Sequence, residues 1–63
     1  MQIEVIINEF KVYEYDAPFA PRVGEMVKRL HHDIEMWRVT EVRHVIDDRF
    51  KQSRVVLFAE KIL

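Results

Sequence analysis

The feature that most constrains the fold of this chain is a series of three short apolar runs between residues 21 and 58. The first reads Pro-Arg-Val-Gly-Glu-Met-Val at 21–27, the second Met-Trp-Arg-Val-Thr-Glu-Val-Arg-His at 36–44, and the third Val-Val-Leu-Phe at 55–58. Short apolar runs separated by a turn or a polar gap are typical of strands in small all-β domains. The sequence therefore predicts a mainly β fold, a small barrel of about five antiparallel strands.

The length and the absence of cysteine limit how such a barrel can be stabilised. The 63 residues are expected to form one domain, 1–63, without a disulfide or a thiolate for zinc or nucleophilic chemistry. A chain this short buries only roughly 60% of its unfolded surface, and such a core rarely supplies more than about 3–5 kcal/mol. We therefore expect dense packing or a partner, with a homodimer as one form.

The first third of the chain predicts two strands and a loop. Apolar residues alternate with polar ones over 2–8, which is typical of a half-buried strand, and Asn8-Glu9 could turn the chain. The β-favouring residues at 12–15 predict a second strand. Two prolines make 17–21 a loop, because they keep their neighbours extended and interrupt strand pairing.

Residues 23–33 allow two interpretations. Val23, Met26, Val27 and Leu30 have the i, i+3, i+4, i+7 spacing of an amphipathic helix, so a short helix at about 23–31 would give an α+β fold. Against the helix, Gly24 lies in its first turn and no capping residue precedes it. A turn at Gly24-Glu25 followed by a strand at 26–31 is the favoured interpretation.

The second half of the chain predicts a long hairpin. Residues 36–39 and 42–46 are strand-like, and Val42 shares the face of Trp37 only if Thr40 or Glu41 is bulged out. Residues 47–52 form a polar connection, and 53–60 form the last strand. That strand has Val55, Leu57 and Ala59 on one face and Val56 and Phe58 on the other. Since both faces are apolar, we expect a partner to cover the second.

The pattern Gly-Glu-x-Val, Trp-x-Val-x-x-Val, Val-Val-Leu-Phe resembles small SH3-like barrels, a superfamily that includes Tudor, KOW and SH3 modules. It is most similar to short uncharacterised SH3-like proteins of bacteria and their phages, which share the Pro-Arg-Val-Gly-Glu and Val-x-His elements. The resemblance covers about two thirds of the chain. It implies a barrel but no agreed activity. A second Trp and a Pro-x-x-x-Tyr motif are missing, as is a late Asp-Tyr-Gly, so neither proline-peptide nor methyl-lysine binding carries over.

The residues that could support catalysis or metal binding do not form a recognisable motif. Adjacent His31 and His32 would point to opposite faces of a strand, and no H-x-x-x-H spacing exists. His44 lies within an apolar strand, and Ser53 has no evident base. One glycine excludes a Gly-rich phosphate loop. We expect no enzyme activity, no metal site and no cofactor.

Protein interaction is the leading functional hypothesis. Arginine, tyrosine, methionine and tryptophan, which are enriched in protein interfaces, are plentiful for a chain of this size. The candidate contact residues are Tyr13, Tyr15, Trp37, Val56 and Phe58. The partner would be a second copy or another protein. Analogy with phage proteins suggests an accessory or inhibitory protein that acts on a host factor.

Binding of single-stranded nucleic acid is the alternative. Small barrels stack bases on aromatic side chains along a basic groove. The candidate residues are Arg22, Lys28, Arg29, Arg38, Arg43 and Arg54. Residues 21–54 carry eight basic and six acidic side chains, a net charge of only +2, which is weak for a dedicated nucleic-acid binder.

The sequence also bears on where the protein is found. None of its apolar runs approaches the roughly 20 residues that a membrane-spanning helix needs. The first residues, Met-Gln-Ile-Glu, lack the basic and apolar regions of a signal peptide. We expect a cytoplasmic protein that does not enter a membrane.

Overall fold

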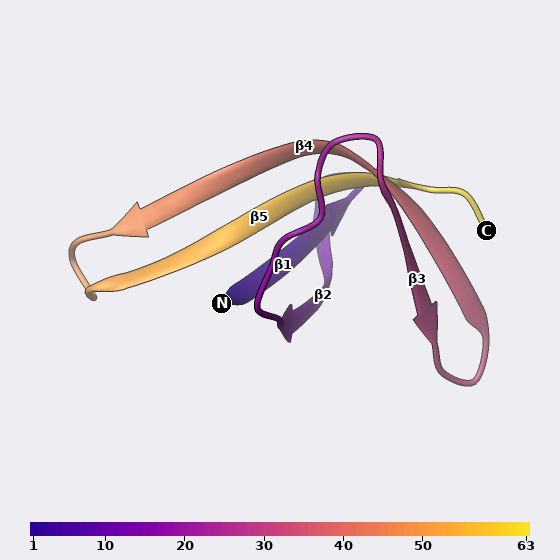
Figure 1. Ribbon diagram of the computed structural model, residues 1–63, viewed down its shortest axis with the longest axis horizontal. Helices are drawn as coiled ribbons and strands as arrows, with labels where there is room; N and C mark the ends of the chain where they lie inside the picture. Colours follow the sequence, from indigo (N-terminus) through magenta and orange to yellow (C-terminus); the bar gives the residue numbers. More distant parts are fainter.

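The computed structural model describes residues 1–63 as one sheet of five strands without a helix. The strands are β1 (Gln2–Ile7), β2 (Phe10–Asp16), β3 (Met26–Leu30), β4 (Ile34–Asp47) and β5 (Gln52–Lys61). They follow one another across the sheet in the order β2-β1-β5-β4-β3. The sheet curls into a half-barrel, and the long β4–β5 hairpin extends beyond the other strands (Figure 1). The mainly β fold and its five strands are confirmed, and the shape is compatible with an SH3-like barrel.

One pair of strands runs in the direction that the sequence analysis did not predict. β1 and β5 are parallel, with Ile3 opposite Val55 and Val5 opposite Leu57, whereas the three other pairs are antiparallel. Each of the four connections reverses the chain, so β5 runs in the same direction as β1. Because β5 pairs with β1, the sheet is mixed rather than wholly antiparallel.

The strand interpretation of residues 26–31 is confirmed, and the alternative of a short helix is wrong. Gly24 has a φ of +90°, a conformation that glycine adopts without strain. Its N–H donates to the Val39 carbonyl, and the N–H of Val39 donates to the carbonyl of Glu25. These bonds tie the start of β3 to β4, which fixes the segment in an extended conformation.

The predicted bulge in the long strand is also confirmed. The pairing of β4 with β5 passes from Val39 opposite Ala59 to Glu41 opposite Phe58, so Thr40 is the extra residue. Its hydroxyl donates to the Phe58 carbonyl at 3.0 Å. The bulge keeps Val42 on the side of the core, against which it packs.

Two hairpin turns match their sequence signals. Asn8 and Glu9 both have positive φ, 53° and 70°, as in the two-residue turns that suit the twist of β hairpins. At the end of β4, the Asp47 carboxylate accepts hydrogen bonds from the backbone N–H and the guanidinium of Arg49. These hydrogen bonds hold the second turn in a defined shape.

The core lies on the inner side of the half-barrel and consists of seven apolar residues from the three central strands. β1 contributes Ile3, Val5 and Ile7, β4 contributes Trp37 and Val39, and β5 contributes Val55 and Leu57. Alternate residues of each strand point inward, as strand geometry requires. The predicted inner face of the last strand, with Val55, Leu57 and Ala59, is therefore confirmed.

Candidate interaction surfaces

The inner groove between the edge strands β2 and β3 brings three of the predicted protein-binding residues together. The ring of Tyr13 stacks on Tyr15 at 5.7 Å between centroids and lies 6.0 Å from the ring of Trp37. Tyr13 and Tyr15 are half-buried, and burial raises the pKa of the Tyr15 hydroxyl. Trp37 is only 2% exposed, so its main role is in the core rather than in a contact surface.

Arg29 crosses this groove from β3. Its guanidinium carbon lies 4.0 Å from the centroid of the Tyr13 ring, a cation–π contact. The same side chain is 3.6 Å from the carboxylate of Glu35. Arg29 therefore joins the two edges of the half-barrel through side chains, and a neighbouring carboxylate balances its charge.

The outer face of the sheet holds the other two predicted contact residues, Val56 and Phe58. Both are half-buried rather than fully exposed. The guanidinium of Arg43 lies 4.6 Å from the centroid of the Phe58 ring and is paired with Glu41. Because a charged side chain of the same molecule covers Phe58, the second apolar face of β5 is smaller than its sequence indicated.

A further charged pair borders this face. Nε of Arg54 is 3.6 Å from the Glu4 carboxylate and is buried without a hydrogen-bond partner. Arg54 lies on β5 and Glu4 on β1, which are adjacent strands. This pair keeps the guanidinium of Arg54 against the sheet.

The six basic residues proposed for nucleic-acid binding do not form one stripe. Arg22 lies in the loop before β3, Arg29 points into the groove, and Lys28 and Arg38 lie on the other side of β3 and β4. Arg43 and Arg54 lie on the outer face of β4 and β5. Carboxylates lie close to three of the six, Arg29, Arg43 and Arg54. The structure thus distributes the six basic side chains over a loop, the groove and the outer face.

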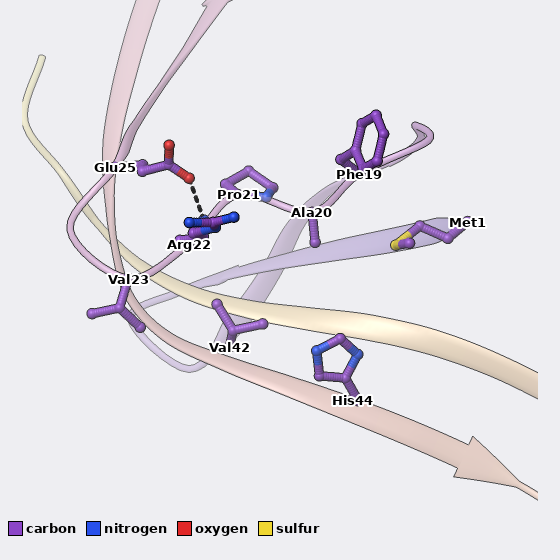
Figure 2. A pocket seen from close by; sticks show the side chains of 9 residues that line it. All are labelled: Met1, Phe19, Ala20, Pro21, Arg22, Val23, Glu25, Val42 and His44. Atoms are coloured by element: carbon purple, nitrogen blue, oxygen red, sulfur yellow. Dashed lines mark hydrogen bonds between the residues drawn. The ribbon is translucent and has the colours of Figure 1, made fainter.

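The largest hollow of the structure was not predicted from the sequence. It is a cleft of about 600 Å³ between the 17–25 loop and the inner side of β4, and Figure 2 shows the side chains around it. Its apolar lining includes Met1, Phe19 and Val23, which are 53%, 82% and 63% exposed. Its polar lining consists of Arg22, Glu25 and His44. The Glu25 carboxylate accepts a hydrogen bond from the backbone N–H of Arg22, which holds the loop (Figure 2).

A second hollow continues along the β4–β5 hairpin. It has a volume of about 220 Å³, shares Met1 and His44 with the first, and reaches Ile46, which is 77% exposed. The pairing of β5 with β1 begins at Arg54, opposite Gln2, so β1 does not extend beside the turn end of the hairpin. We call the exposed apolar side chains along both hollows, Met1, Phe19, Val23 and Ile46, the apolar strip.

The histidines do not assemble a metal site. The rings of His31 and His32 are 6.5 Å apart in an edge-on arrangement in the turn between β3 and β4, and Nε2 of His31 is 3.4 Å from Glu35. No group of three or more histidine, aspartate or glutamate side chains is placed to hold a metal ion. His44 stands in the wall of the cleft, which Glu25 also lines, and takes part in none of the ion pairs.

One signal in the sequence could have indicated the apolar strip. Ile46 lies just before the charged turn of the hairpin, Phe50 lies within that turn, and Phe19 lies between two prolines in a loop. Large apolar residues at such positions have little chance of reaching the core. The strip itself depends on which strands are adjacent, and that information comes only from the fold.

Comparison with known proteins adds no relative. The chain matches no protein-family model, no curated protein and no solved structure at a significant level. The structure contains no helix long and apolar enough to cross a membrane. Arguments about function therefore rest on the surfaces of the molecule.

Proposed function

We propose that this chain is a non-enzymatic protein-interaction module and that the apolar strip is its main contact surface. The observation that carries the proposal is the distribution of large apolar side chains. Seven apolar residues are buried, whereas twelve large ones are exposed. Scattered exposed apolar residues are normal, but several of them lining one cleft are typical of an interaction site.

The chemistry of the cleft supports binding rather than catalysis. None of the ion pairs of the molecule involves His44, and the Glu25 carboxylate accepts a hydrogen bond from the backbone N–H of Arg22. A general base needs a defined orientation and a reacting group within hydrogen-bond reach. The few polar groups in the cleft are suited to orienting an apolar segment of a partner.

The partner in this proposal is a protein, either a second copy or a host factor. A role as a phage or bacterial accessory or inhibitory protein in the cytoplasm is part of the proposal and rests on the sequence resemblance alone. The small size of the core supports a partner, because such a chain gains stability when it binds.

The solution mass tests this proposal. We would measure light scattering after size-exclusion at low and high salt, comparing the unchanged chain with Ile46→Asp. The control Gln52→Glu places a carboxylate on the outer side of the same hairpin. We expect a salt-stable complex that Ile46→Asp dissociates and Gln52→Glu preserves, with both variants folded. A complex that survives Ile46→Asp but is lost in Phe58→Asp would move the contact to the outer face.

One observation favours a second candidate, the binding of single-stranded nucleic acid. The groove that holds Tyr13 and Tyr15 has Lys28 and Arg29 beside it, in a hollow of about 290 Å³. Bases stack on such rings, and binding that depends on phosphates weakens steeply with salt. Material that nuclease removes, and that is shed at high salt, would favour this candidate. The variant with Lys28→Glu and Arg29→Glu, the two basic residues beside the groove, would then lose binding.

A further inference from the structure

The two edge strands, β2 and β3, are unpaired on their outer sides. Each has one neighbour in the sheet, and no Cα of β2 lies within 8 Å of a Cα of β3. The chain makes 34 backbone hydrogen bonds, whereas about 42 to 46 are usual for 63 residues. Unpaired edges offer backbone N–H and C=O groups to any strand that fits.

The two edges carry opposite charge. β2 contains Glu14 and Asp16 against Lys11, which lies 3.2 Å from the Glu14 carboxylate, and Glu9 precedes the strand in the turn. β3 contains Lys28 and Arg29 without an acidic residue; Glu35 of β4 balances the charge of Arg29, so Lys28 supplies the free positive charge of this edge. Complementary charges on two surfaces of one molecule favour contact between unlike edges and disfavour contact between like edges.

The strand directions also suit a contact between unlike edges. The strand β2 is antiparallel to β1. The strand β3 is parallel to β1, because β5 is parallel to β1, β4 is antiparallel to β5, and β3 is antiparallel to β4. When a second copy continues the sheet with the same side inward, its β2 lies antiparallel to β3 of the first copy. Antiparallel pairing is the more stable geometry per residue.

We propose that copies of this chain associate head to tail, with the β3 edge of one copy pairing with the β2 edge of the next. The inference rests on the proposed function and names a second copy as one partner. The register that suits both sides of the sheet places Glu14 opposite Lys28 on the outside. On the inside it places Tyr13 opposite Arg29 and Tyr15 opposite Val27.

Each of these pairs is favourable across a pair of strands. Glu14 and Lys28 have opposite charges, and opposite charges on facing strand positions stabilise a sheet. Arg29 already lies over Tyr13 within the chain, so association replaces that contact with the same kind of contact to the neighbour. A symmetric contact would instead pair two β2 edges or two β3 edges, which brings like charges close together and is unfavourable.

The contact between unlike edges has a consequence for the size of the assembly. A heterologous contact leaves one free β2 edge and one free β3 edge, so further copies can add until a ring closes or a filament grows. The assembly is therefore expected to exceed a dimer and to depend on protein concentration.

Disulfide cross-linking tests the register directly, because the chain has no cysteine of its own. The variants Glu14→Cys and Lys28→Cys are oxidised separately and as a mixture. Facing strand positions lie within the Cα separation that a disulfide spans. We expect the mixture to form the mixed dimer in about tenfold greater yield than either variant forms its own dimer, a preference of about 1.4 kcal/mol. The variant with both substitutions should form a ladder of higher oligomers.

A matched control sets the background of random collisions. Gln52→Cys lies at the exposed end of the hairpin, away from both edges, and is mixed with Lys28→Cys. Cross-linking of Glu14→Cys with Lys28→Cys at the rate of this control would overturn the proposal. Dimers of each single variant that form as readily as the mixed dimer would also overturn it, in favour of a symmetric contact.

The outcomes separate this inference from the proposed function. Loss of a complex in Ile46→Asp without specific cross-linking would support the apolar strip and refute edge pairing. Specific cross-linking with complexes unchanged by Ile46→Asp would support edge pairing and refute the strip as the contact surface. A monomer that neither cross-links nor forms any complex would refute both.

Discussion

Leu57→Ala tests whether the inner side of β5 holds the fold together. The Leu57 side chain is 1% exposed and lies on the central strand, between β1 and β4. Removing a buried leucine costs about 2–5 kcal/mol, depending on how well the site collapses. Paired strands on both sides limit that collapse, so we expect a loss of about 3 kcal/mol in the free energy of unfolding.

This loss is large relative to the total stability. At about 0.05–0.15 kcal/mol per residue, a chain of this length is stable by about 3–9 kcal/mol. A loss of about 3 kcal/mol lowers the ratio of folded to unfolded chains by about a hundredfold. With a urea m-value of about 1 kcal/mol/M, the midpoint should fall by about 3 M.

Urea unfolding followed by tryptophan fluorescence measures this change. Trp37 is the single tryptophan, is buried and lies close to Tyr13, so its emission reports on the core. Measurements at two protein concentrations separate folding from association, because binding adds apparent stability.

The neighbouring residue provides the control. Val56 is half-buried on the outer face, so Val56→Ala should cost less than about 1 kcal/mol, since about 0.8 kcal/mol is lost per buried methylene. Equal losses for Val56→Ala and Leu57→Ala would refute the assignment of inner and outer faces. A loss below about 1 kcal/mol for Leu57→Ala would show that the core is not built around β5.

Three further predictions concern the bulge and two titrating groups. Thr40→Val removes the hydrogen bond to the Phe58 carbonyl and should cost about 0.5–1.5 kcal/mol in urea unfolding, whereas no change would show that the bulge does not need the bond. Hydrogen bonds from Arg49 lower the pKa of Asp47. The ionised Asp47 carboxylate therefore stabilises the fold above the ordinary carboxyl pKa, and this stabilisation is lost as the pH falls through the lowered pKa. Asp47→Asn should therefore flatten the acid limb of a plot of stability against pH, and an unchanged limb would contradict this role. Burial raises the pKa of Tyr15, so its contribution is fully present below the ordinary tyrosine pKa and is lost as the pH rises through the raised value. Tyr15→Phe should flatten the alkaline limb, and a limb as steep as in the unchanged chain would assign that loss to another group.

Local sequence patterns predicted most of the strands because strand alternation depends on neighbouring residues. The alternation at residues 2–8 and 53–60 matches β1 and β5, and the offset between Val39 and Val42 indicated a bulge at Thr40 or Glu41, which the structure places at Thr40. The positive φ at Asn8 likewise agrees with its expected turn. These features need only a few consecutive residues, so the sequence was enough to predict them.

The candidate site was predicted less well, because it depends on residues that are distant along the chain. Trp37 was expected at a contact surface, but its neighbours in the sheet bury it. Phe58 was expected to be uncovered, yet Arg43 from the adjacent strand lies over its ring. The cleft between the 17–25 loop and β4 exists only because the loop passes close to that strand.

The sequence by itself determined a small all-β chain: alternating apolar residues set the strands, and its polar turns, prolines and single glycine set their ends. The tertiary structure decided which strands are neighbours, and so placed β5 parallel to β1 and left β2 and β3 as open edges. The physical reason is the range of the interactions. Strand and turn preferences act between adjacent residues, whereas pairing and burial depend on contacts between segments far apart in sequence.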